Sequence, residues 1–590
     1  MKKPCRAGLL LVAMATIVTV AACGVPSSGP ATVVEEVPRD SAVDSYGDSL
    51  ASLAPTVDAE ETVRNFLGAA AGDWVNRNER LDKFAGTETN WSEPSAGMPI
   101  VRLTGDEITA TSSSTTSATV RVTGSIVGVY NQYGQVKKAS GDTSYVREFD
   151  LGREYTSDHW KIQKPPEQVV VNDAIFSDYY LAQPLYFPAT FDESDTLVPD
   201  LRWIPKSLSD AGVRYERLLD WLLTGPSEWL ETSVNSAIPP GTSREAISVQ
   251  DDGVTVEFST RSATSPLDRY ETISAQLAWT FGLELDTSIT LVIDGREQLR
   301  SEAKDWVTHN RAPSRDDFGE NRDLIYYIQD GTVMSATTDA PFAGASPDGL
   351  QEAALEPGGD RMAAIVATGG SYSLVAGQSN ELEPVEGFSA TVLTDVQWVD
   401  RSKLLVLADG KPTMVRVSTG ESSVISMSEL DDPITAISLA PDSRRLAYVS
   451  GDRAYVAPIT YDDAASNLGE AQRVGLNVTE VRDVGWSQET HLVMIGTVPD
   501  AEEWLWQVSI DNAYQHQLEG AKTSTTGAVG DSLAVRCNSP QRSPAVGQPM
   551  VVAVGTSIAR VYAGSYGPLV VDDDEGNEVD AVGTSPFVSP

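Results

Sequence analysis

The segment Leu439-Ala440-Pro441-Asp442-Ser443-Arg444-Arg445-Leu446-Ala447 is the clearest copy of a repeat that decides the fold of the C-terminal half of this chain. Related segments begin at Leu355, Trp398 and Trp486, and a fainter copy begins at Val529. The four clear copies start 43, 41 and 47 residues apart along the chain. This spacing is the length of one four-stranded blade of a β-propeller.

Residues 317–590 show the other features that a ring of blades requires. Helical periodicity is absent, and short strand-like runs alternate with turns rich in Gly, Asp and Pro. One blade alone would leave an apolar face exposed to water, so only a closed ring is stable. We therefore predict a C-terminal β-propeller of five blades, with a sixth blade left open. The turn at Asp442 resembles the SPDG-type turns of TolB-like propellers, and we expect this residue to form a turn and not to act as an acid catalyst.

Residues 183–310 predict a compact α+β domain in which helices alternate with strands. The first helix, at residues 210–223, stops at Gly225-Pro226, because Gly accepts a left-handed cap and Pro cannot continue a helix. The second helix, at residues 267–281, ends at Gly282. The residues expected to be buried on the two helices are Val213, Leu218, Leu219 and Leu222, and Tyr270, Ile273, Leu277 and Phe281. The expected strands lie at residues 185–187, 254–258 and 289–293.

Residues 56–172 predict a smaller α+β domain that precedes this one. Asp58 and Glu61 have the spacing of a capping box, and apolar residues from Val63 to Trp74 follow at helical spacing. From residue 101 onward the period changes to two, as expected for the strands of an antiparallel sheet.

The N-terminal residues predict an exported protein. A cationic start without acids precedes an apolar run from residue 7 to about residue 20. This run is too short to span ~30 Å of hydrocarbon, which takes about 20 apolar residues. We therefore predict a signal peptide over residues 1–22.

Cys23 follows Val20-Ala21-Ala22, and this pattern resembles a bacterial lipobox. That resemblance implies a diacylglycerol thioether on Cys23 and an amide-linked acyl chain, such as palmitate, on the new N-terminus. Two or three acyl chains anchor a protein stably, at roughly 0.8 kcal/mol per buried methylene. Residues 23–55 are rich in Pro, Ser, Gly and acids and predict a flexible tether. Ordinary secretion with a chance cysteine is the alternative.

Composition narrows the classes of function. The 590 residues carry a formal net charge of -41, which disfavours contact with nucleic acid and leaves a lipid anchor as the expected membrane contact. The chain has three cysteines, so Cys537 would be alone after processing, and we expect it to be a small buried residue. Phosphate-binding loops, dinucleotide fingerprints, nucleophile elbows and zinc motifs are absent from the sequence. We therefore predict no cofactor, no metal site and no enzymatic activity.

Five segments of the middle region resemble a GerMN domain, which occurs in exported proteins of spore and cell-envelope systems. The resemblance implies no catalytic residues, since the domain has none that are agreed. Its Gly225-Pro226-Ser227 and Ile238-Pro239-Pro240-Gly241-Thr242 segments are predicted as a helix stop and a turn, with a binding rim as the alternative. The five segments are residues 222–226, 237–242, 254–258, 275–277 and 292–295.

The order of signal peptide, lipobox, small α+β domain, GerMN domain and propeller resembles the LpqB lipoproteins of actinobacteria, including Val25-Pro26-Ser27-Ser28-Gly29-Pro30 after Cys23. The resemblance implies a cell-membrane lipoprotein on the extracytoplasmic face. It also implies association with the extracellular domain of the MtrB sensor histidine kinase, and a role in MtrAB signalling and envelope homeostasis. The alternative function is binding or hydrolysis of cell-wall glycan at the central funnel of the propeller, and a purely structural spacer is a third.

Overall fold

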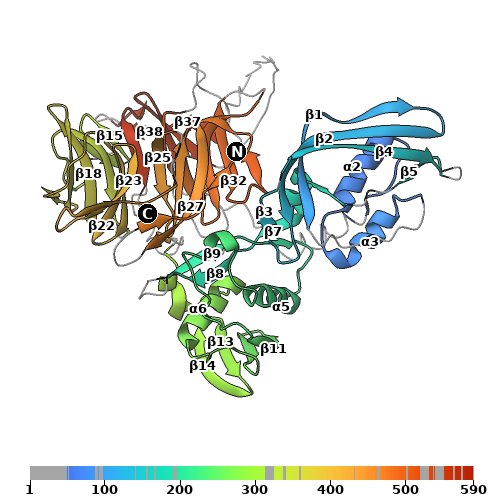
Figure 1. The fold of residues 1–590 in the computed structure, drawn as a ribbon. Coiled ribbons are helices and arrows are strands. Elements are labelled where there is room, and N and C mark those ends of the chain that lie inside the picture. The colour runs from blue at the N-terminus through green and yellow to red at the C-terminus, as the bar shows by residue number, and fades with distance from the viewer. Residues whose placement is uncertain are drawn as a thin grey trace, which may run out of the picture.

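The computed structural model describes residue 50 and residues 52–588, apart from residues 87–90, 92–96, 140, 155–156, 165, 167, 191–195, 312–324, 336–340, 358–359, 429, 431, 462–465, 500–502, 519–529, 536, 538–549, 563–564 and 573–575. The predicted signal peptide, Cys23 and most of the predicted tether lie outside the described residues. The described chain is rich in strands, has few helices and forms several domains (Figure 1).

The N-terminal domain packs helices on a curled six-stranded sheet. Asp58 caps the first helix by accepting the N–H of Glu61 at 2.8 Å, which is half of the predicted capping box, because the Asp58 N–H donates to Thr56 and not to Glu61. The helix was expected to continue to Trp74, which is wrong: it ends at Ala69, because Gly72 adopts a left-handed φ of 86° that interrupts the turn. The sheet order is β5 (Trp160–Ile162), β4 (Ser144–Arg153), β2 (Ser117–Tyr130), β1 (Met98–Ser113) and β6 (Val171–Asn172), with β3 (Val136–Lys137) on β2. The helices are α2 (Ala59–Ala69), α3 (Trp74–Asp82) and α4 (Asp173–Tyr179).

The middle domain builds a four-stranded sheet from two hairpins joined by a helix. Strands β12 and β13 run parallel, and α6 forms the crossover between them. The helix ends at Gly282, which has a φ of 64°, as predicted. The sheet order is β11 (Ser243–Gln250), β12 (Gly253–Ser259), β13 (Ser288–Ile293) and β14 (Arg296–Glu302), and the helices are α5 (Ala211–Leu222) and α6 (Tyr270–Phe281).

Two short antiparallel strand pairs complete the middle region, and one encloses the other in the chain. Strand β8 (Leu185–Pro188) pairs with β9 (Leu197–Asp200) and packs against α6. Strand β7 (Tyr180–Ala182) pairs with β10 (Trp203–Pro205). One expectation for α5 is wrong: Val213 is 49% exposed, because it lies on the face of the helix opposite to Leu218, Leu219 and Leu222.

The described C-terminal residues form a ring of six blades, which settles the blade that the sequence left open. Their innermost strands are neighbours in the order β17, β21, β25, β30, β34 and β40, and β40 contacts β17 in turn. The first four blades are β17 (Leu350–Leu355) to β20 (Glu381–Pro384), β21 (Leu393–Asp400) to β24 (Ser422–Val424), β25 (Ile434–Leu439) to β29 (Gln472–Val474), and β30 (Thr479–Gln488) to β33 (Gln515–Gln517). The fifth blade is β34 (Ser532–Val535) to β37 (Ser565–Pro568).

The sixth blade joins the two ends of the propeller chain. Strand β40 (Thr584–Val588) pairs with β15 (Ile325–Gln329), which pairs with β16 (Thr332–Ser335). This pairing closes the ring with the last strand of the chain. A search for consecutive copies could not find this blade, because its strands come from opposite ends of the region.

The four clear repeated segments form the hairpins between the first and second strands of their blades, and they join neighbouring blades. The fainter copy does not match this position, because its described residues precede and enter β34, the first strand of the fifth blade. The Trp486 indole N–H donates to the carbonyl oxygen of Ser438 in the preceding blade at 3.0 Å, while the Arg445 guanidinium lies 4.8 Å from the centre of the indole ring. Trp398 and Arg361 repeat this arrangement between the first two blades, where the Arg361 guanidinium lies 4.9 Å from the centre of the Trp398 ring. Each of these inter-blade contacts combines a hydrogen bond with a cation–π contact.

The fourth blade contacts the region that precedes the propeller. Trp203 of β10 donates to Asp511 at 2.7 Å, and Arg102 of β1 donates to Gln515 at 2.8 Å. Core residues of the N-terminal domain and of this blade belong to one continuous buried apolar cluster. In Figure 1 the N-terminal domain lies to the right of the propeller and the middle domain lies below it.

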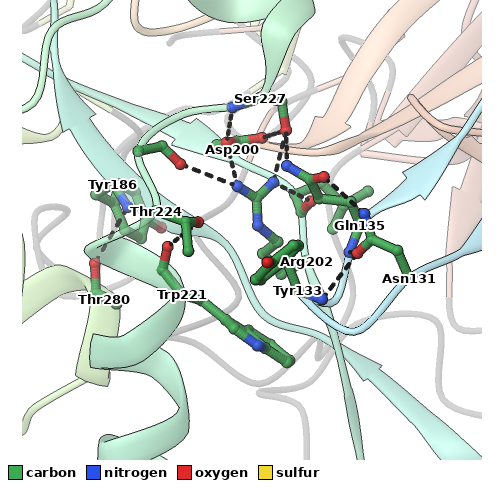
Figure 2. Close-up of polar contacts among 12 residues, drawn as sticks. Asn131, Tyr133, Gln135, Tyr186, Asp200, Arg202, Trp221, Thr224, Ser227 and Thr280 are labelled. Carbon is green, nitrogen blue, oxygen red and sulfur yellow. Dashed lines mark hydrogen bonds and ion pairs between the residues drawn. The ribbon is translucent and has the colours of Figure 1, made fainter. Parts of the chain in front are cut away.

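The N-terminal and middle domains are joined by a buried polar network around Arg202, shown in Figure 2. Its guanidinium lies 2.9 Å from the Asp200 carboxylate and donates to the Ser227 hydroxyl at 2.6 Å. Ser227 also accepts a hydrogen bond from Gln135 of the N-terminal domain at 3.1 Å. The Gly225-Pro226-Ser227 segment therefore ends α5 and joins two domains, in agreement with its predicted structural role.

Candidate functional site: the central channel of the propeller

The innermost strands of all six blades surround a central cavity of about 620 Å³. This volume lies within the range of small-molecule sites in proteins, which is about 300–1,000 Å³. The cavity reaches solvent near the turns that follow the innermost strands, where Arg401 lines it with a side chain that is 74% exposed.

Three carboxylates occupy matching positions in three of the blades. Glu352 lies in β17, Asp395 in β21 and Asp483 in β30, each three residues before the residue that begins the repeated turn segment. All three line the cavity and are half-buried there. The matching residues of the third and sixth blades are Ala436 and Ser585, so the ring of negative charge is incomplete.

Backbone hydrogen bonds from the next blade fix these side chains. Glu352 accepts the N–H of Asp395 at 2.7 Å, Asp395 accepts the N–H of Ile437 at 3.2 Å, and Asp483 accepts the N–H of Leu533 at 2.7 Å. A β-bulge in the innermost strand accompanies each of them, and Asp395 has a left-handed φ of 54°. The bulges re-aim these residues out of the regular ladder.

The electrostatics of the channel favour protonated carboxyl groups. Burial, together with the nearby charge of Asp483, raises the pKa of Glu352 to about 7. Burial raises the pKa of Asp483 to about 6. The pKa of Asp395 lies well above its ordinary value, because of burial and of the charges of Glu352 and Asp483. Glu352 and Asp483 therefore exchange protons near neutral pH.

Ionic and aromatic side chains lie toward the turns. Glu356 is 5% exposed and pairs with Arg401 at 2.9 Å. Arg311, which follows the middle domain, donates to the carbonyl oxygen of Val399 at 3.3 Å. The rings of Trp398 and Trp486 also line the cavity, although each carries an arginine guanidinium over one face.

The residues predicted from sequence fall mainly outside this channel. Cys23, the predicted lipid attachment site, lies outside the described residues. Asp442 has the predicted turn role, since it accepts the N–H of Arg444 at 2.7 Å and pairs with Arg445 at 2.5 Å. Cys537 is buried in the channel wall, as expected of a small buried residue.

Two negative findings concern only the part of the chain that the structure describes. Within it, His, Cys, Asp and Glu side chains form no group of three that could hold a metal ion. No helix found there is long and apolar enough to cross a bilayer.

Sequence reasoning did not single out Glu352, Asp395 and Asp483. A signal was present, since Thr394-Asp395-Val396-Gln397-Trp398 and Arg482-Asp483-Val484-Gly485-Trp486 place an acid three residues before the repeated tryptophan. Residues at one repeat position lie at matching places on the innermost strands, so acids there reach the same channel.

Comparison with known proteins matches three parts of the chain. Three family models match: "Lipoprotein LpqB, N-terminal domain" at residues 53–177, the Germane model, described as "Sporulation and spore germination", at residues 184–299, and "Lipoprotein LpqB beta-propeller domain" at residues 331–535. Among solved structures, TolB from Acinetobacter baumannii is similar with a TM-score of 0.31 and 12% identity, over 46% of this chain and 68% of that chain.

Curated relatives cover most of the chain. Lipoprotein LpqB of Corynebacterium jeikeium is 24% identical over 82% of this chain and 85% of the relative. Lipoprotein LpqB of Mycobacterium tuberculosis is 24% identical over 84% of this chain and 88% of the relative. Through its N-terminal, GerMN and propeller domains, this chain belongs to the LpqB lipoprotein family.

Proposed function

We propose that this chain is held at the extracytoplasmic face of the cell membrane by acyl chains on Cys23, and that it acts there by binding other proteins. Membership of a lipoprotein family supports the anchor, and so does the small-residue pattern before Cys23. The relatives carry the name of a lipoprotein and not of an enzyme, which supports an accessory role.

The observation that carries the proposal is the rigid joining of three domains. The N-terminal and middle domains both pack on the fourth blade, through buried contacts of Trp203, Tyr186 and Asn310. A body fixed in this way presents several surfaces in constant orientation, which lowers the entropic cost of binding a large partner.

The partner that we propose is the extracellular domain of a sensor histidine kinase of the MtrAB type, so that the lipoprotein modulates its signalling. A formal net charge of -41 favours a partner with a basic surface. A tether of some 30 residues has an r.m.s. reach of roughly 30 Å, which suits contact with a receptor in the same membrane.

Co-purification from detergent-solubilised membranes tests this proposal. The native lipoprotein, cross-linked in cells before extraction, should recover a sensor kinase at near-stoichiometric yield. A Cys23→Ala variant should recover much less, because it no longer shares the membrane with the kinase, while Cys537→Ser should behave as the native protein. Recovery of abundant envelope proteins alone would contradict the proposal.

One observation favours a second candidate, which is action on cell-wall glycan. Glycosidases need two carboxyl groups with different proton affinities, and the channel contains three such groups. The indole faces that could stack on a sugar are partly covered by Arg361 and Arg445. Release of soluble sugar from purified cell wall, abolished by Asp483→Asn, would establish this function in place of the first.

A further inference from the structure

The three channel carboxylates line one cavity, and the arginines that line it, Arg311 and Arg401, make their contacts with Val399 and Glu356. Among the described residues, neither Glu352, Asp395 nor Asp483 forms an ion pair, although charged side chains elsewhere on the propeller do. Burying uncompensated acids is costly, and the cost is relieved when a cation enters. The channel therefore favours a positively charged occupant.

A second observation points to the same cavity. Glu356 is 5% exposed and lines the channel, and its Oε1 atom pairs with Arg401. Its Oε2 atom is buried and has no hydrogen-bond partner among the residues that the structure describes. A buried carboxylate oxygen without a donor leaves the lining of the cavity one hydrogen bond short.

The geometry favours an organic cation over a metal ion. Within the described chain, no three carboxylates come close enough to ligate one ion. At least one oxygen of each already accepts a backbone N–H group, which leaves fewer oxygen lone pairs for a metal ion. Between the acids the wall is apolar, with Val396, Val484 and Leu533, and this combination suits methylene groups ending in an ammonium, which has three donors.

We propose that the propeller channel binds an alkylammonium group, whose methylene chain lies on the apolar wall and whose charge lies among Glu352, Asp395 and Asp483. The group is either the end of a free diamine or the side chain of a lysine in a peptide. This inference does not depend on the sensor-kinase partner.

Calorimetry on the detergent-solubilised full chain tests it. The probes are 1,5-diaminopentane, the peptide acetyl-Gly-Lys-Gly-amide and uncharged 1,5-pentanediol, at pH 7.5 and near-physiological salt. We expect saturable one-to-one binding of at least one amine and none of the diol. Binding of the diamine alone assigns a free amine, and binding of the peptide assigns a lysine side chain.

Proton release provides a second readout. A bound cation stabilises ionised carboxylates, so the binding heat should change between buffers of different ionisation enthalpy, with a net release of protons. Affinity should fall as the pH drops through about 7 and then about 6, the pKa values of Glu352 and Asp483. The other charged or titratable groups that line the channel are Arg311, Glu356, Asp400, Arg401 and Cys537.

Matched variants separate the channel from general attraction to an acidic protein. Asp395→Asn and Asp483→Asn keep an oxygen for the backbone N–H groups and should weaken binding by about tenfold or more. Asp409→Asn is the control, because Asp409 also has a left-handed φ, of 50°, and accepts two backbone N–H groups, but lies outside the channel. Glu352→Gln gives a third channel variant if either of the others fails to fold.

Two results would overturn the proposal. One is the absence of saturable binding of either amine up to about 10 mM, which is weaker than ordinary specific small-molecule binding. The other is an affinity that is the same in the folded channel variants, in Asp409→Asn and in the native chain, since this would place the amines on the outer surface.

Discussion

The hydroxyl group of Tyr186 donates a hydrogen bond to the buried carboxylate of Glu489 at 2.8 Å, across 303 positions of sequence. The other carboxylate oxygen of Glu489 accepts the side-chain amide of Asn310 at 2.7 Å. One turn of the fourth blade therefore holds both the beginning and the end of the middle domain. This contact couples the unfolding of the middle domain to that of the propeller.

Replacing Glu489 should uncouple these two domains. Glu489→Ala leaves the Tyr186 hydroxyl and the Asn310 amide without their acceptor, which lowers the free energy of unfolding by about 3 kcal/mol. Calorimetry should show the middle domain melting earlier and separately. Glu421→Ala removes an exposed partner of Arg416 and should change little; equal effects of the two substitutions would disprove the coupling.

The buried ion pair of Arg202 and Asp200 (Figure 2) should contribute more to stability than an exposed ion pair. Asp200→Ala leaves the fully buried Arg202 guanidinium unpaired and should cost about 3–5 kcal/mol. Asp220→Ala breaks the exposed contact with Arg244 and should cost about 0–1 kcal/mol. Denaturant unfolding of both variants measures the difference. A loss of unfolding free energy below about 1 kcal/mol for Asp200→Ala would contradict the role of the Arg202 network in joining the two domains.

The inter-blade contact of Arg445 with Trp486 should stabilise the closed propeller ring. Arg445 is 0% exposed, pairs with Asp442 and covers the Trp486 ring of the next blade. Arg445→Met should lower the free energy of unfolding by about 3–5 kcal/mol, because it leaves the Asp442 carboxylate buried and unpaired. Arg416→Met, at an exposed pair, is the matched control. In Arg445→Met, hydrogen exchange should be faster in both the third and the fourth blade. Faster exchange in the third blade alone would show that Arg445 does not join the two blades.

Glu352 should make the propeller less stable as the pH rises. Its pKa is about 7 in the folded chain and 4.5 ordinarily, so the folded state binds more protons between these values. Its contribution to stability is therefore present below pH 4.5 and lost as the pH rises through about 7. Glu352→Gln lacks this dependence and should gain stability relative to the native chain across that window. A constant difference between the two proteins from pH 4.5 to 7.5 would contradict the raised pKa.

His491 should make the protein less stable as the pH falls. Burial lowers its pKa from 6.5 to about 4, so the folded state binds fewer protons between these values. Its contribution is present above pH 6.5 and lost as the pH falls through about 4, with about 3 kcal/mol at stake. Since His491 lies edge-on to Trp203 at 6.2 Å, acid should loosen the contact with the N-terminal domain first. Trp fluorescence of the native chain and of His491→Gln measures this; equal acid sensitivity would refute it.

Local signals in the sequence predicted much of the fold. Asp58 and Gly282 mark helix ends by backbone chemistry that acts within a few residues, and both were placed correctly. Val213 was not, because it is about two and a half helical turns from Leu222, which puts the two residues on opposite faces of the helix. The sixth blade was left open because β40 and β15 are distant in sequence and pair only when the ring closes.

The channel was harder to predict than the blades. Glu352, Asp395 and Asp483 belong to different blades, and nothing within any one blade shows that they meet. Their raised pKa values arise from burial and, for Glu352 and Asp395, also from the charges of the other channel acids, which are properties of the closed propeller. The role of Ser227 was predicted as a helix stop, but its hydrogen bonds to Arg202 and Gln135 depend on the packing of two domains.

The proposed function depends most directly on the lipid at Cys23, and mass spectrometry of the N-terminal peptide of the native protein measures it. We predict a chain that begins at Cys23, carries a diacylglycerol thioether and an N-acyl group, and is recovered from membranes, with Cys23→Ala released and Cys537→Ser retained. An unmodified cysteine at position 23, in native protein recovered from the culture fluid, would contradict the account.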